Sequence, residues 1–129
     1  AYDTRGRLVS STTLAAAPVA VINVWASWNY DSQDIQRRLQ SLQRRSGGRL
    51  SVLGLSLDAG KSDCKDALRR DSITYANVCS GEMLEDKTVT KLGLTAIPDN
   101  IVLKNGRIVA RSLRADELEK KVKELLGLK

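Results

Sequence analysis

The chain has 129 residues, 42% of them hydrophobic, which is enough for one folded domain with a sizeable core. Its 21 lysines and arginines exceed its 15 acidic residues and give a formal net charge of +6. The basic residues occur in pairs along predicted helices, mixed with acids, so they favour solvated helix surfaces over a nucleic-acid site. The sequence has no histidine, which excludes Ser–His and Cys–His nucleophile pairs and any histidine zinc site.

Metal, cofactor and membrane binding are also disfavoured. Cys64 and Cys79 are the only thiol ligands, too few for a structural zinc site, and we expect no metal and no cofactor. No apolar run approaches the ~20 residues needed to cross a bilayer. We therefore expect any membrane attachment to come through a tether outside this chain.

The first segments of the chain predict strands. Tyr2 to Val9 alternates around Arg5-Gly6, which predicts an N-terminal β-hairpin. Val19 to Trp25 is small, β-branched and almost wholly apolar, as expected of a central strand that is covered on both faces.

A helix is predicted after this strand. Asp31 and Ser32 are suitable N-cap residues, and Gly47-Gly48 is a suitable end. An apolar stripe at helical spacing runs through an Arg/Gln-rich surface: Ile35, Leu39 and Leu42.

The remaining elements alternate between strands and helices. In chain order they are a strand at Arg49–Asp58, a short helix capped by Ser62, a strand at Ile73–Val78, a helix at Glu82–Leu92, a hairpin of Ile101–Leu103 and Ile108–Arg111, and a helix carrying Leu118, Val122 and Leu125 that stops at Gly127. Asn105-Gly106 is the hairpin turn. Strand–helix alternation predicts a parallel sheet, and the hairpin adds antiparallel strands, so we predict an α/β fold with a central mixed β-sheet flanked by helices.

Three separate stretches resemble the thioredoxin-like superfamily. They are "VINVWASW", "GLTAIPDNIVLKNGRIVARSL" and the N-terminal "YDTRGRLVSSTTL". The resemblance is to the TlpA/ResA-like (AhpC/TSA-related) exported bacterial branch and covers nearly the whole chain. It implies a single thioredoxin-like domain at 1–129, with an N-terminal β-hairpin, exported to the periplasm or anchored facing it.

The expected catalytic motif is degenerate. In the family, the turn after the aromatic pair holds Cys-x-x-Cys, whose first thiolate attacks and whose second cysteine resolves the mixed disulfide. Here the four residues are Asn29-Tyr30-Asp31-Ser32, so Asn29 and Ser32 stand at the cysteine positions. Neither can form a mixed disulfide. The resemblance therefore implies a non-catalytic binding or structural module of a longer exported protein.

Other family features are retained. Ile97-Pro98 matches the cis-proline loop, where family members pair with an extended protein segment. Trp28 and Tyr30 are candidate exposed anchors for such a partner, while Trp25 is predicted to be core. The loop could equally be structural, and Trp28 could simply cover the turn.

The only cysteines, Cys64 and Cys79, lie elsewhere. A structural disulfide, two free buried thiols and a relocated redox pair are all compatible with their positions. The third possibility gives the alternative function, a thiol-disulfide oxidoreductase that uses this pair. A peroxiredoxin-like peroxidase is disfavoured because the first long helix contains no cysteine.

Overall fold

The structure is a computed structural model that describes residues 3–7, 11–58, 60–79 and 97–128. Its sheet has five strands in the order β3-β2-β1-β4-β5. The strands are β1 (Val19–Trp25), β2 (Leu50–Ser56), β3 (Ala76–Val78), β4 (Asp99–Lys104) and β5 (Arg107–Arg111). The helices are α1 (Ser11–Ala16), α2 (Tyr30–Arg45), α3 (Lys61–Arg70) and α5 (Ala115–Leu126). Within the described residues, no helix is both long enough and apolar enough to span a bilayer.

The centre of the sheet is β1, whose seven residues are all buried. It pairs in parallel with β2 and antiparallel with β4. The β2 strand pairs in parallel with β3, and β4 pairs antiparallel with β5. The predicted mixed sheet and the predicted bounds Val19–Trp25 are therefore confirmed.

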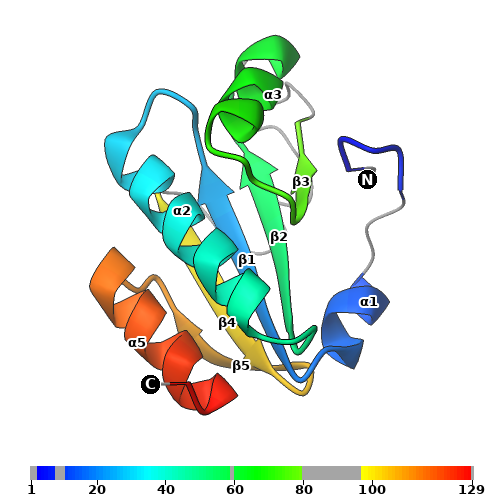
Figure 1. The fold of residues 1–129 in the computed structure, drawn as a ribbon, viewed down its shortest axis with the longest axis vertical. Coiled ribbons are helices and arrows are strands. Elements are labelled where there is room, and N and C mark those ends of the chain that lie inside the picture. The colour runs from blue at the N-terminus through cyan, green and yellow to red at the C-terminus, as the bar shows by residue number, and fades with distance from the viewer. Residues whose placement is uncertain (1–2, 8–10, 59, 80–96, 129) are drawn as a thin grey trace.

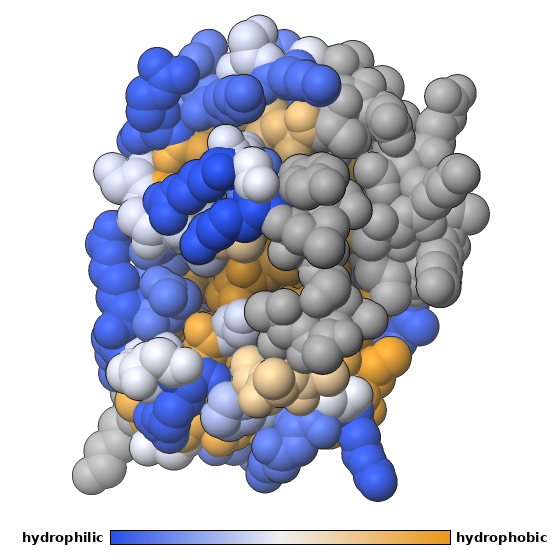
Figure 2. All heavy atoms as spheres, turned by 90° about the vertical axis from the view of Figure 1, so that its right-hand side faces the viewer, coloured by the Kyte–Doolittle hydropathy of each residue, from blue (hydrophilic) through white to orange (hydrophobic). Residues whose placement is uncertain are grey.

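Helices cover both faces of the sheet, as Figure 1 shows with α2 and α5 on one side and α1 on the other. Side chains of α2 and α5 pack with alternate residues of β1 into one apolar cluster, which includes Val21, Leu39 and Val122. Two later residues of β1, Ile22 and Val24, point the other way and belong to a cluster on the opposite face. On the side that carries α1, Figure 2 shows hydrophobic residues in the middle of the surface between hydrophilic ones.

The ends of several helices and strands lie where the sequence signals predict. Asn105 and Gly106, between β4 and β5, have φ values of 51° and 81°, the left-handed geometry of a tight hairpin turn. Gly47 and Gly127 adopt positive φ after α2 and at the end of α5.

The N-terminal segment forms the predicted turn. Asp3 accepts hydrogen bonds from the backbone N–H groups of Arg5 and Arg7 at 2.9 and 2.8 Å. Burial opposes ionisation of Asp3, but these bonds and the Arg7 guanidinium together lower its pKa. The backbone N–H of Thr4 donates to the carbonyl of Asn77, which ties the turn to β3. The strand segments predicted on either side of the turn lie largely outside the described residues, as does the predicted helix at Glu82–Leu92.

Several local predictions are wrong. The N-cap of α2 is Asn29, and Asp31 and Ser32 lie in the first turn, because the Asn29 side chain reaches the Ser32 backbone N–H. The N-cap of α3 is Gly60, not Ser62. Helix α1 was not predicted.

The third strand is shorter than predicted because the side chain of Gln40 in α2 forms hydrogen bonds with Thr74, in the segment before the strand. The backbone N–H of Thr74 donates to the Gln40 side chain at 2.7 Å, and the Gln40 amide donates back to the Thr74 hydroxyl at 2.8 Å. This N–H is therefore bonded to α2 instead of to β2, and β3 begins only at Ala76.

Candidate functional site

The candidate site is the turn that joins β1 to α2. The backbone N–H of Asn29 donates to the carbonyl of Ala26 at 3.1 Å and closes the turn. Asn29 Oδ1 accepts from the Ser32 N–H at 2.8 Å and caps the helix. The Gln33 amide donates to the carbonyl of Ser27 at 2.8 Å. The turn is thus held from inside the helix as well as by its own backbone.

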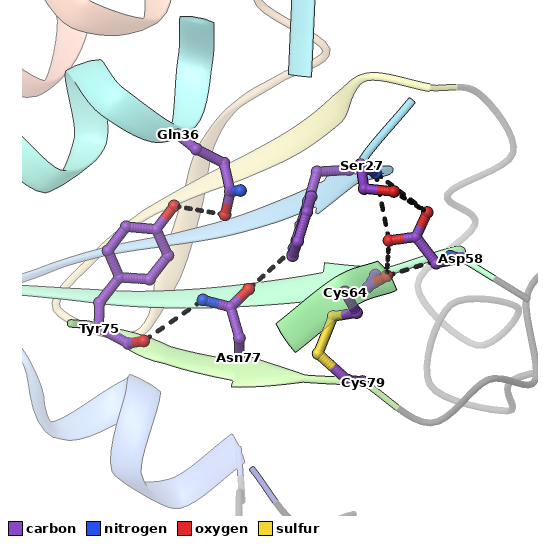
Figure 3. The surroundings of a disulfide bond; sticks show 9 residues. Ser27, Gln36, Asp58, Cys64, Tyr75, Asn77 and Cys79 are labelled. Carbon is purple, nitrogen blue, oxygen red and sulfur yellow. Dashed lines mark hydrogen bonds between the residues drawn. A yellow bond between two sulfur atoms is a disulfide. The ribbon is translucent and has the colours of Figure 1, made fainter. Parts of the chain in front are cut away.

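Asp58, directly after β2, holds the same turn from the neighbouring strand (Figure 3). Its carboxylate accepts from the Ser27 backbone N–H at 3.0 and 3.1 Å and from the Ser27 hydroxyl at 2.9 Å. The Ser56 hydroxyl donates to the other carboxylate oxygen at 2.9 Å. The Asp58 residue is only 3% exposed, so these donors replace the water that the carboxylate loses on folding.

The two residues at the expected cysteine positions have structural contacts. Asn29 is the helix cap described above. Ser32 is fully buried, and its hydroxyl oxygen accepts from the Ala26 backbone N–H at 3.4 Å. The chain has no histidine that could take the proton of this hydroxyl. Positions 29 and 32 therefore carry neither a thiol nor a hydroxyl paired with a histidine.

Two aromatic side chains project from the turn. Trp28 is 65% exposed and Tyr30 is 76% exposed, whereas Trp25 is fully buried as predicted. The peptide bond between Ile97 and Pro98 is cis. Because the next residue, Asp99, pairs with Val24 near the end of β1, the Ile97–Pro98 segment lies at the same end of the sheet as the turn. Trp28 and Tyr30 on the turn and Ile97 and Pro98 before β4 therefore lie at the same end of the β1–β4 strand pair.

The cysteines are not part of this turn. Cys64 of α3 and Cys79, just after β3, form a disulfide with Cα atoms 5.8 Å apart (Figure 3). Cys64 is fully buried and packs in a cluster with Trp25, Ala67 and Leu68. The bond therefore joins α3 to the edge of the sheet, and two free thiols, one of the alternatives, are not present.

The chain is similar to solved thiol-disulfide oxidoreductase structures. One is the C-terminal domain of a Bacteroides thetaiotaomicron protein described as a thiol-disulfide oxidoreductase, 30% identical, with a TM-score of 0.78 over 97% of this chain and 88% of that one. Another is a thiol-disulfide oxidoreductase from Bacteroides fragilis, 26% identical, with a TM-score of 0.80 over 95% and 93% of the two chains. The chain belongs to the thioredoxin-like superfamily. No protein-family model and no curated protein matches it.

In this thioredoxin-like protein, a buried chain of hydrogen bonds begins at Trp25, the last residue of β1 before the turn. The Trp25 indole N–H donates to Asn77 Oδ1 at 2.8 Å, and Asn77 donates to the Tyr75 carbonyl at 3.3 Å. The Tyr75 hydroxyl donates to the Gln36 side chain at 2.9 Å, as Figure 3 shows. Burial, and then the charge of Asp71, raise the pKa of Tyr75, so this hydroxyl stays protonated and remains a donor.

Sequence reasoning missed two residues that support the turn. The sequence places Asp58 at the end of a predicted strand. The ends of neighbouring parallel strands lie side by side, so a carboxylate at that position was a signal that it could reach the turn after β1. Gly54 of β2 was not singled out. A Cβ at Gly54 would overlap the Asn77 side chain and lie 3.0 Å from the Trp25 indole nitrogen, so only glycine leaves room for the Trp25–Asn77 bond. A glycine inside an apolar strand was the available signal.

Proposed function

We propose that this thioredoxin-like protein is a non-catalytic binding or structural module. The observation that carries the proposal is the use of Asn29 and Ser32 as structural groups, a helix cap and a buried acceptor, where the family resemblance places its two cysteines. Thiol-disulfide exchange needs a thiolate that attacks a disulfide sulfur. Neither an amide nor a buried hydroxyl supplies one.

An insulin-reduction assay with dithiothreitol tests this proposal. We expect the wild-type protein to give no turnover above dithiothreitol alone, and the N29C/S32C variant to give measurable turnover. The C64A/C79A variant is the matched control for the alternative function, in which the relocated pair reacts. Wild-type turnover that disappears in C64A/C79A would establish the alternative, and any robust wild-type turnover would refute a non-catalytic role.

We further propose that a surface formed by Trp28, Tyr30, Ile97 and Pro98, here called the aromatic edge, binds an extended segment of a partner protein. Trp28 and Tyr30 expose most of their side chains, at the same end of the sheet as Ile97 and Pro98. Aromatic side chains are well suited to such contacts because they bury a large apolar area with few rotatable bonds. Main-chain hydrogen bonds would come from the backbone at Ile97, which precedes β4 and lies outside its ladder.

The binding proposal is tested separately from the redox proposal. The probe is the reduced insulin B chain, labelled with fluorescein and titrated with protein while anisotropy is measured. We expect the W28A/Y30A variant to bind at least tenfold more weakly than wild type. The matched control is I108A/V109A, which removes two exposed apolar side chains of β5. Equal binding by wild type and W28A/Y30A would refute the proposal.

The disulfide supports a location outside the reducing cytosol. Disulfides persist in oxidising compartments such as the bacterial periplasm. We therefore propose an exported protein, periplasmic or anchored facing the periplasm. The test is the thiol state of the protein in its native host, trapped with a maleimide: the Cys64–Cys79 bond is expected to be intact, and a fully reduced pair would contradict the proposal.

A further inference from the structure

A basic depression lies between α3, the loop before β3, the N-terminal turn and the end of α2. Its volume is about 460 Å³. Arg5, Arg44, Lys65 and Arg69 line it, and no acidic residue is among its described lining residues. The four cations come from the N-terminal turn, α2 and α3, so the tertiary structure brings them together. In the sequence they are dispersed among acids.

Nearby carboxylates leave most of this charge uncompensated. Asp71 is next to the depression in sequence, but its side chain is only 7% exposed and pairs with Arg37 and Arg70. Arg44 donates to a backbone carbonyl, that of Ser72, at 3.4 Å. Among the residues that the structure describes, Arg69 is the one lining cation whose side chain is bonded to an acidic residue. Its partner is Asp66, at 3.1 Å in an exposed ion pair. Exposed pairs of this kind are weak and exchange readily with another anion.

The depression has an apolar part, here called its floor, formed by Leu68, Ile73 and Tyr75, beside the hydroxyl-bearing residues Thr4, Ser72 and Thr74. Leu68 and Tyr75 are buried beneath it and Ile73 is half-buried. The Tyr75 hydroxyl is bonded to Gln36 within the buried chain of hydrogen bonds, so it is not available to a ligand in the depression. An apolar floor within a ring of cations matches a ligand that carries an aliphatic group between negative charges. A free phosphate has no such group, and the described lining offers no exposed aromatic ring on which a nucleic-acid base could stack.

We propose that the basic depression binds an extended acidic peptide segment, with an aliphatic side chain on the floor and flanking carboxylates on Arg5, Arg44, Lys65 and Arg69. This site is distinct from the aromatic edge. Tyr30 and Arg44 belong to opposite ends of α2, and fourteen residues of helix are about 21 Å long. The inference does not depend on the proposed function, because it uses none of the residues of the β1–α2 turn.

The probe for this site is a fluorescein-labelled peptide, Glu-Glu-Leu-Glu-Glu, titrated with the full chain at low salt. The variant R44Q/K65Q/R69Q removes three cations of the depression. The matched control K104Q/R107Q/K120Q removes the same charge from exposed positions outside it. We expect the first variant to bind the peptide about tenfold more weakly. The control is expected to stay within about twofold of wild type, a smaller loss that long-range attraction accounts for.

A second peptide tests the floor. Glu-Glu-Gly-Glu-Glu keeps the charges and lacks the aliphatic side chain, and we expect it to bind wild type several-fold more weakly than the leucine peptide. Equal losses in the two charge variants would overturn the proposal in favour of attraction by net charge alone. Equal binding of the two peptides would also overturn it, because the floor would then contribute nothing. Circular dichroism melting curves establish that both variants are folded.

Discussion

Breaking the Cys64–Cys79 disulfide is expected to lower the free energy of unfolding by about 3 kcal/mol. The cysteines are 15 residues apart, and in the chain-entropy model a cross-link closing a loop of this size restricts the unfolded chain by about that amount. Total stabilities of domains are about 5–15 kcal/mol, so this bond accounts for a fifth or more of the total. The corresponding fall in melting temperature is roughly 10 °C.

Urea unfolding monitored by tryptophan fluorescence measures this effect. Trp25 packs in the same cluster as Cys64, so its emission reports on the region that the bond holds. Three samples are compared: oxidised wild type, wild type reduced with dithiothreitol, and C64A/C79A. We expect the oxidised protein to be the most stable, with the other two close to each other. Equal unfolding free energies for oxidised and reduced wild type would refute the chain-entropy argument for this bond.

Three further changes are predicted to alter stability, each measured by urea unfolding. D58A should lower the free energy of unfolding by about 2–4 kcal/mol, because the Ser27 N–H and hydroxyl lose a charged acceptor; a loss below 1 kcal/mol would contradict the role of Asp58 in holding the turn. G54A should lower it by about 1–3 kcal/mol, because the added methyl group overlaps Asn77, and an unchanged midpoint would show that the strand yields freely. Two arginines lower the pKa of Asp71 despite its burial, so its contribution is present above the unfolded-state pKa and is lost as the pH falls through the folded-state pKa. Wild type should therefore lose more stability than D71N between about pH 5 and pH 1, and parallel pH profiles would refute this.

Local sequence patterns were sufficient to predict most of the fold. The strand at Val19–Trp25 was predicted with correct bounds because all of its side chains are buried and its composition shows this directly. Asn105-Gly106 predicted the hairpin turn because few other residue pairs adopt positive φ at both positions. The cap of α2 was misplaced by two or three residues, since Asn29, Asp31 and Ser32 can all cap a helix and their order in the sequence does not distinguish them.

The candidate site divides in the same way. The sequence by itself determined that the turn has no cysteine and that Trp28 and Tyr30 follow a buried strand, because these are facts of residue identity and local pattern. Only the tertiary structure decided that Cys64 and Cys79 are bonded and that Asp58 holds the turn. Each of these contacts joins residues that are distant in sequence, and their geometry depends on how strands and helices pack. The basic depression is a further case, since its cations meet only after the chain has folded.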